Sequence, residues 1–380
     1  MRKFCDVKVY AEGKGIINTD LVFGEKILGF EDETAAEKIE IPSGATVYPA
    51  FIDTHVHGAG GADAMDGNVS ALSVIAETLA KEGTASFLAT TMTQSVENIT
   101  RALSAVKDYM AAGSEKGAEV LGVHLEGPFI AEKYKGAQPL EYIAAPDAEV
   151  FFKYQNASGG AIKIVTLAPE NEGAEKFISA LAADGVIASI GHTSAKFADI
   201  EKAVAAGATN VTHTYNAQTP LHHRDIGTVG AALLLDCLQT EVIADTIHVS
   251  VPALKLLVKN KPDDKINLIT DAMRAKGLPD GESELGGQKV FVKNGEARLA
   301  DGTLAGSVLK MNIAVKNIVE KVGVPLLKAV DFATANPAKS LGIFDKKGSI
   351  KKGKDADFAV LDEEFNVIMT IRAGKIIYKA

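Results

Sequence analysis

The sequence predicts an α/β fold, a (β/α)8 barrel of the TIM type with a small β-sandwich domain built from both chain ends. The chain has 380 residues, which fits a barrel of about 250 residues plus roughly a hundred more. In its middle, short β-rich apolar runs alternate with stretches of helical spacing, and the pattern repeats eight times. At both ends, short apolar runs alternate with glycine turns.

The barrel is expected over residues 51–340. The eight apolar runs are 50–58, 85–92, 120–127, 162–170, 186–193, 210–217, 241–248 and 266–273. Stretches between them, such as 70–83, 95–110 and 197–208, carry apolar residues at i, i+3, i+4 and i+7, which predicts helices. Eight such units imply a closed barrel of buried parallel strands. A doubly wound open sheet is the alternative, but no glycine-rich phosphate fingerprint follows the first strand.

The small β domain is expected from residues 1–50 together with 341–380. Runs such as VKVYAEG near the start and NVIMTIR near the end show strand periodicity, with turn residues between them. Neither piece is large enough to bury a core by itself. We therefore expect the two ends to pair with each other.

Composition and charge narrow the classes of partner. Hydrophobic residues make up 47% of the chain and charged residues 23%, as in a soluble globular protein with a large core. The net charge of −9 argues against nucleic acid but allows a small phosphorylated ligand. No apolar run approaches the ~18 residues that span a bilayer. The two cysteines, Cys5 and Cys237, form no CxxC motif, so we expect a reducing cytoplasm and no disulfide framework.

All eight histidines lie toward the carboxyl ends of predicted strands or in the loops that follow, which is the end where barrel enzymes build their active sites. His55 and His57 flank one residue of the first strand, so both imidazoles share a face and can approach one metal ion. Asp53 has the same parity, and we expect it to support the site rather than bind the ion.

Three further residues complete a predicted metal site of four histidines and one carboxylate, and a fourth residue, Asp271, is expected beside it. Glu126 ends strand three and can bridge two cations, His192 ends strand five, His213 ends strand six, and Asp271 ends strand eight. Such a set suits one or two divalent ions of zinc, iron or manganese. The alternatives are a salt-bridged barrel carboxylate for Glu126 and a helix cap for Asp271. For His124, ligation and a buried hydrogen-bonded role both stay open.

The motifs HVHG, HLEGPF, GHT, THTYNA, ITDAM and GTLAGS resemble the amidohydrolase superfamily and, within it, the N-acetylglucosamine-6-phosphate deacetylase family. The resemblance covers nearly the whole chain. It implies that Asp271 is the catalytic acid and base. It also implies metal ligands at His55, His57, Glu126, His192 and His213. Lys163, on strand four, lies far from the carboxyl end, so Glu126 is a better metal bridge than a carbamylated lysine.

The resemblance also implies substrate contacts and a homodimer. Residues matching those that hold the sugar phosphate and the acyl group are Asn216, Ala217, Arg224 and His248. Lesser sugar contacts match Ala137, Leu304, Ala305 and Gly306. The sequence departs from the family pattern at Thr246, where glycine is usual, and at Thr214 and Gln218, which leaves the acyl and sugar preference open.

The expected reaction is hydrolysis of N-acetylglucosamine 6-phosphate to glucosamine 6-phosphate and acetate. We expect Asp271 to take a proton from the attacking water and pass it to the leaving nitrogen, while His248 polarises the acetyl oxygen. The planar fork of Arg224 suits phosphate, with His222 and His223 as neighbours, although a solvated surface arginine is the alternative. Other readings are a related amidohydrolase acting on another N-acyl sugar or a cyclic amide, and a silent scaffold, which the intact ligand set disfavours.

Overall fold

Eight parallel strands form a barrel in the computed structural model, which describes residues 1–30 and 36–380. The strands are β6 (Phe51–Val56), β9 (Thr84–Thr91), β10 (Glu119–Glu126), β11 (Ile162–Leu167), β12 (Ile187–Ile190), β13 (Asn210–Val211), β14 (Gln239–Ile243) and β15 (Ile266–Ile269). Neighbours in this list are hydrogen-bonded. Past the end of β15, the Asp271 N–H donates to the His55 carbonyl at 2.8 Å, and the His57 N–H donates to the Ala272 carbonyl at 2.9 Å. These two bonds join the last strand to the first, so the predicted barrel is confirmed.

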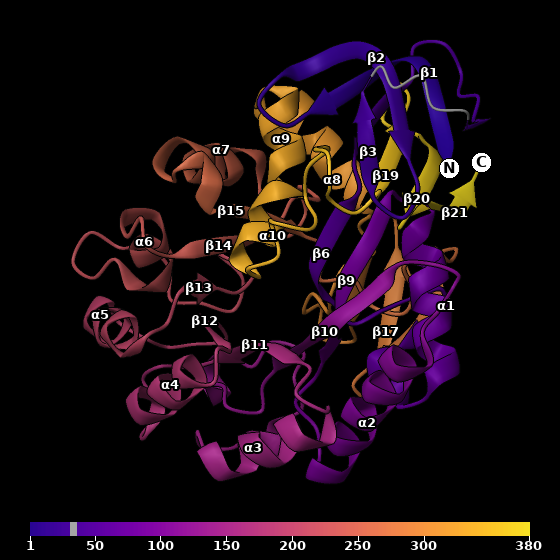
Figure 1. Cartoon of the computed structure of the whole chain (residues 1–380). Helices are drawn as coiled ribbons and strands as arrows, with labels where there is room; N and C mark the ends of the chain where they lie inside the picture. The colour runs from indigo at the N-terminus through magenta and orange to yellow at the C-terminus, as the bar shows by residue number, and fades with distance from the viewer. Residues whose placement is uncertain (31–35) are drawn as a thin grey trace.

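Helices surround the barrel on its outside (Figure 1). They are α1 (Val69–Ala80), α2 (Val96–Ala112), α3 (Ala148–Ala157), α4 (Ala174–Ala183), α5 (Phe197–Ala206), α6 (Gly227–Leu234) and α7 (Val251–Asn260). In α2 the Ser95 hydroxyl accepts the Asn98 N–H at 3.2 Å, which caps the helix start. Ile99, Leu103 and Val106 follow at helical spacing and are fully buried. The helical stretches predicted at 70–83, 95–110 and 197–208 correspond to α1, α2 and α5.

The two chain ends share one eight-stranded sheet. Its strands are β1 (Arg2–Ala11), β2 (Gly15–Phe23), β3 (Ile27–Phe30), β4 (Glu37–Lys38), β5 (Thr46–Pro49), β19 (Phe358–Leu361), β20 (Val367–Arg372) and β21 (Lys375–Lys379). Antiparallel pairing of β5 with β19 links the two ends, and strands from both ends lie together in one sheet (Figure 1). The rings of Phe4, Phe23 and Phe358 pack together in its core. The β domain built from both ends is confirmed, while the boundaries at residues 50 and 341 stay a prediction.

A smaller, three-stranded sheet follows β15 along the chain and precedes α8 (Met311–Asn317), α9 (Leu326–Phe332) and α10 (Ala335–Ser340). The sequence patterns did not predict this sheet. It contains β16 (Gly281–Leu285), β17 (Gln288–Lys293) and β18 (Glu296–Leu299). Leu285 and Val290 of this sheet belong to a buried cluster with Met92 and Met273, which follow β9 and β15. The sheet therefore packs against the carboxyl end of the barrel, where it adds a wall to the site described below.

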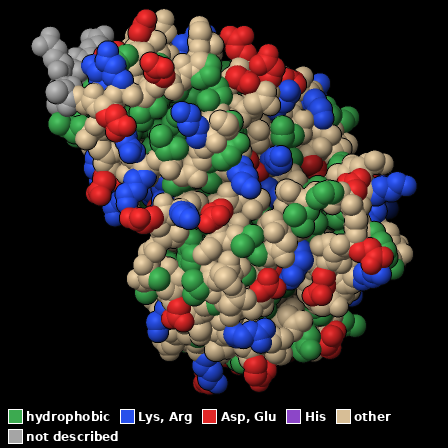
Figure 2. Space-filling view, turned by 90° about the vertical axis from the view of Figure 1, so that its right-hand side faces the viewer, with side chains coloured by type: hydrophobic (Ala, Val, Ile, Leu, Met, Phe, Trp, Pro, Cys, Tyr) green, Lys and Arg blue, Asp and Glu red, His purple; other side chains and the backbone are tan. Residues whose placement is uncertain are grey.

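The surface carries mixed charges on the face that Figure 2 shows. Lysine and arginine side chains alternate there with aspartate and glutamate, and no histidine is visible on that face. Within residues 1–30 and 36–380, no helix combines the length and the apolar character that crossing a membrane requires.

Candidate metal centre and active site

The predicted metal ligands converge at the carboxyl ends of the barrel strands. His55 lies in β6 and His57 directly follows that strand. His192, His213 and Asp271 each lie two residues beyond the end of their strand, β12, β13 and β15. All three have left-handed backbone conformations, with φ of 46°, 27° and 48°. Non-glycine residues adopt this region at a cost that is typical of functional sites, and here it turns the three side chains inward.

The carboxylate of Glu126, the last residue of β10, is the centre of the cluster. Its Oε1 atom lies 3.3 Å from Nε2 of His55, 3.3 Å from Nε2 of His192 and 3.1 Å from Nε2 of His213. Its Oε2 atom lies 3.3 Å from Nε2 of His57. Gly127, which follows, has a φ of 77°, and a Cβ there would lie 2.1 Å from the Thr93 hydroxyl. Only glycine allows the chain to turn away this closely behind the carboxylate.

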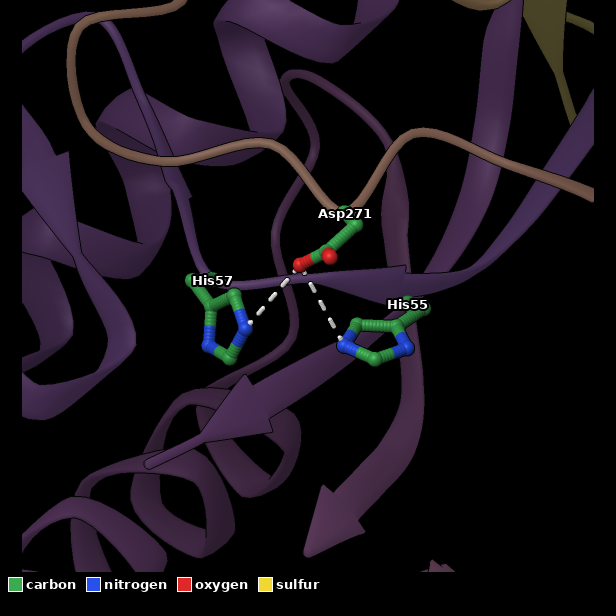
Figure 3. Close-up of side chains that lie close together, drawn as sticks. All are labelled: His55, His57 and Asp271. Carbon is green, nitrogen blue, oxygen red and sulfur yellow. Dashed lines mark ion pairs between the residues drawn. The ribbon is translucent and has the colours of Figure 1, made fainter. Parts of the chain in front are cut away.

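Asp271 completes a second set of ligands on the His55 and His57 side. Its Oδ1 atom lies 3.4 Å from Nε2 of His55 and 3.2 Å from Nε2 of His57, as the dashed lines in Figure 3 show. Two potential ligand sets therefore adjoin: His55, His57 and Asp271 in one, and Glu126, His192 and His213 in the other. Ligand atoms bound tetrahedrally at about 2.0–2.1 Å lie roughly 3.3–3.4 Å apart. The spacing of the atoms in both sets is close to that value.

Outer hydrogen bonds orient two of the imidazoles. Nδ1 of His192 lies 2.8 Å from the Tyr134 carbonyl, and Nδ1 of His213 lies 3.1 Å from the Asn216 carbonyl. A carbonyl only accepts hydrogen bonds, so each Nδ1 carries the proton and each Nε2 keeps a lone pair. The two Nε2 atoms face each other at 3.1 Å, an arrangement that a shared cation stabilises.

His55 and His124 take part in a buried network below the cluster. Nδ1 of His55 lies 3.3 Å from Glu241, whose other oxygen accepts the Thr54 hydroxyl at 3.0 Å. His124 donates from Nδ1 to the Thr54 carbonyl at 3.1 Å and accepts the Thr166 hydroxyl at Nε2, at 2.7 Å. Burial, together with the nearby His55, lowers the pKa of His124 to about 4. With both nitrogens engaged, His124 has the hydrogen-bonded role and no lone pair free for a metal.

The electrostatics of the cluster favour a bound cation. Burial alone would lower the pKa of His57, but the Asp271 and Glu126 carboxylates raise it to about 10. Burial alone would raise the pKa of Asp271, but His55 and His57 lower it to about 2. Nε2 of His55 is buried beside both carboxylates and hydrogen-bonds to no group among the described residues. The raised pKa of His57 therefore reflects the uncompensated negative charge of two buried carboxylates, and a divalent ion bound in place of that proton would balance this charge.

A cleft of about 340 Å³ opens over this cluster. Its lining includes six of the predicted substrate contacts: Ala137, Asn216, Ala217, His248, Leu304 and Gly306. Two others do not reach it. Ala305 is fully buried outside the lining, and Arg224 is exposed, with Nη1 3.0 Å from Nε2 of His223.

His248 is oriented by Asp245, which lies two residues past the end of β14. Oδ2 of Asp245 lies 2.6 Å from Nδ1 of His248, and Oδ1 accepts the His248 N–H at 2.8 Å. Because Nδ1 is held by the carboxylate, Nε2 is the nitrogen left for a ligand.

The cleft also contains residues that sequence reasoning missed. Gln138 is buried, donates from Nε2 to Oε2 of Glu126 at 2.6 Å, and accepts the Thr93 N–H at 2.8 Å. It therefore holds the central carboxylate in place. Its position beside Ala137 in KGAQP was the one available signal. The other missed lining residues are Met92, Lys133, Tyr134, Gly136, Leu285 and Thr303.

Comparisons with known proteins agree with this site. The model of the amidohydrolase family matches residues 46–377, so the chain belongs to that family. The chain is 47% identical to the N-acetylglucosamine-6-phosphate deacetylase of Bacillus subtilis (strain 168) over 348 residues, 91% of this chain and 88% of that protein. Within the amidohydrolases it therefore belongs with the N-acetylglucosamine-6-phosphate deacetylases, and the resemblance predicted from its motifs is confirmed.

Two further matches are deacetylases that are named for phosphorylated N-acetyl sugars. The chain is 40% identical to the N-acetylgalactosamine-6-phosphate deacetylase of Escherichia coli O157:H7 over 319 residues, 84% of each protein. It also superimposes on the N-acetyl-D-glucosamine-6-phosphate deacetylase of Mycobacterium smegmatis, solved as an aspartate-to-alanine variant in complex with N-acetyl-D-glucosamine-6-phosphate. That comparison has a TM-score of 0.92 and 29% identity, and covers 100% of this chain and 99% of the other.

Proposed function

We propose that this chain hydrolyses N-acetylglucosamine 6-phosphate to glucosamine 6-phosphate and acetate, a step of amino-sugar catabolism or recycling. The observation that carries the proposal is the Glu126 carboxylate at the base of a cleft, shared by two sets of imidazoles, with Asp271 beside one set. This arrangement supplies hydrolytic chemistry, and the named relatives supply the substrate class.

The metal centre would hold one or two divalent cations, of zinc, iron or manganese. His55, His57 and Asp271 would hold one, and Glu126, His192 and His213 the other. Glu126, which lies within 3.3 Å of all four imidazoles, would contribute to both. Such a cation, when bound, lowers the pKa of water toward ~7 and polarises a carbonyl.

Asp271 and His248 perform the proton transfers and the polarisation that amide cleavage requires. Asp271 is ionised at neutral pH because His55 and His57 lower the pKa of its carboxyl. Its carboxylate can accept a proton from the attacking water and then donate that proton to the departing nitrogen. When the His248 ring is protonated at both nitrogens, Asp245 accepts from Nδ1 and Nε2 donates to the acetyl oxygen.

The proposal is tested by acetate release from purified protein whose metal content is counted. The substrates are N-acetylglucosamine 6-phosphate, the same sugar without phosphate, and N-acetylgalactosamine 6-phosphate, which the Escherichia coli relative makes the second candidate. We expect metal-dependent turnover with a preference for the first. Faster turnover of the galactose isomer would favour the second candidate, and no turnover of either phosphosugar by metal-replete protein would contradict both.

Arg224 is proposed as a phosphate ligand, although the structure places it on an exposed loop outside the cleft lining. If Arg224 binds phosphate, Arg224→Ala should lower kcat/KM for the phosphorylated sugar about 10- to 100-fold, the weight of hydrogen bonds to a charged group. The unphosphorylated sugar should be unaffected. Arg2→Ala, in the terminal sheet, is the control. Equal losses on both sugars would contradict the phosphate role, and no loss on either would leave Arg224 as a solvated surface residue.

We also propose that the enzyme is a homodimer and acts in the cytoplasm. The dimer rests on the family resemblance, and light scattering of the purified protein measures it. Cys5 and Cys237 are free cysteines, which supports a reducing compartment.

A further inference from the structure

A buried carboxylate that the proposed chemistry does not use lies directly behind the ligands. Asp53, in β6, is 0% exposed. Its Oδ1 atom accepts the His55 N–H at 3.2 Å and the Thr270 N–H at 3.3 Å. Its Oδ2 atom accepts the Thr270 hydroxyl at 2.5 Å. One side chain thus receives three hydrogen bonds from two segments that lie 217 residues apart in sequence.

These two segments carry His55, His57 and Asp271, whose relative positions define one of the two ligand sets. The first continues through His55 to His57, and the second continues from Thr270 to Asp271. They meet where the barrel closes, through the bond from the Asp271 N–H to the His55 carbonyl at 2.8 Å. Because Asp271 has a left-handed φ of 48°, its orientation depends on restraints from its neighbours. Asp53 supplies such restraints on the side of Thr270.

Further contacts hold the same segment from other directions. The Ser307 hydroxyl donates to the Thr270 carbonyl at 2.5 Å, and the Ser307 N–H donates to the Asp271 carbonyl at 2.8 Å. Lys276 lies 3.5 Å from the Thr270 hydroxyl and pairs with Glu82 at 2.5 Å. Lys276 also supplies the positive charge that a buried Asp53 carboxylate needs. Burying Asp53, Glu82 and Lys276 costs free energy, and apolar side chains at these positions would avoid that cost.

We propose that Asp53 and Thr270 form a clamp that fixes the Asp271 carboxylate against the His55 and His57 imidazoles. Both are positioning residues, because they act through Asp271 and the two histidines and lie outside the cleft lining. The proposal rests on the proposed function for its kinetic consequence, but not for its effect on metal binding. Loss of outer contacts of this kind lowers metal affinity or activity about 10- to 100-fold.

A pair of substitutions at position 270 tests the clamp. Thr270→Val keeps the shape of the side chain and removes the hydroxyl, whereas Thr270→Ser keeps the hydroxyl. Thr240→Val is the matched control, because Thr240 is a buried strand threonine of β14 that donates to the Lys265 carbonyl at 2.8 Å, away from the cleft. Asp53→Asn changes the carboxylate that accepts the Thr270 hydroxyl, and it replaces Thr270→Val in the test if that variant does not fold.

We expect Thr270→Val and Asp53→Asn to lower kcat about 10- to 100-fold with KM within about twofold, or to lose one bound metal per chain. Thr270→Ser and Thr240→Val should match the unaltered enzyme. The clamp is wrong if the first two keep normal kcat and metal content, or if Thr270→Ser falls as far as Thr270→Val. Metal counted by mass spectrometry keeps the test valid even if the proposed substrate is not hydrolysed.

Discussion

Asp271→Asn should lower kcat for N-acetylglucosamine 6-phosphate about 10³- to 10⁴-fold while the protein stays folded and keeps bound metal. The substitution preserves the size of the side chain but removes the atom that accepts and returns the proton, and general acid–base groups contribute up to about 10⁴-fold. Glu126, His192 and His213 do not depend on Asp271 for their contacts with one another, so that ligand set should stay occupied. Initial rates and metal content of the same preparation measure both effects.

Asp263→Asn is the matched control for this substitution. Asp263 lies before β15, at the opposite end of the same strand from Asp271, and its carboxylate is half exposed beside Lys328. We expect unchanged turnover from this control. Near-normal activity in Asp271→Asn would remove Asp271 from the mechanism.

Glu126→Gln should remove both metal and activity. The Glu126 carboxylate lies within 3.3 Å of Nε2 atoms from four histidines. An amide offers one oxygen and places an N–H₂ donor where a second acceptor stood, so it cannot bridge two cations. We expect metal content to fall below one ion per chain and kcat to fall by about 10³-fold or more, because water activation depends on the ion.

Glu119→Gln provides the control on the same strand, because Glu119 begins β10 at the other end of the barrel and pairs with Lys347. It should bind metal and turn over normally. A Glu126→Gln protein that holds its full metal content and remains active would show that Glu126 is only a structural carboxylate of the barrel.

Barrel architecture was predictable because it depends on local patterns that repeat. Each strand is a short apolar run, and carboxyl ends of parallel strands must meet at one end of the barrel. That rule alone brings together His55, Glu126, His192, His213 and Asp271, which come from different strands. Left-handed backbone angles at three of these residues were not predicted, because histidine and aspartate do not require such angles.

Long-range contacts were what the sequence did not reveal. Gln138 lies in a loop, and its hydrogen bonds to Glu126 and Thr93 form only when that loop folds. No periodic sequence pattern predicts such contacts. Strands β16 to β18 are short, and residues such as Leu285 become buried only by packing against the barrel mouth.

Arg224 stays a predicted phosphate ligand. It lies near His213 along the chain. However, His222 and Asp225 exchange backbone hydrogen bonds at 3.3 and 3.1 Å, which form a tight turn with Arg224 at its tip, away from the cleft lining.

Metal removal and restoration would show whether the buried histidine and carboxylate cluster binds the cation on which deacetylation depends. The protein is depleted with a chelator, dialysed, and titrated separately with zinc, iron(II) and manganese, while acetate release from N-acetylglucosamine 6-phosphate is followed. We expect activity to disappear on depletion and to return with about one or two equivalents of a suitable ion. Full turnover by protein shown to contain no metal would contradict this expectation.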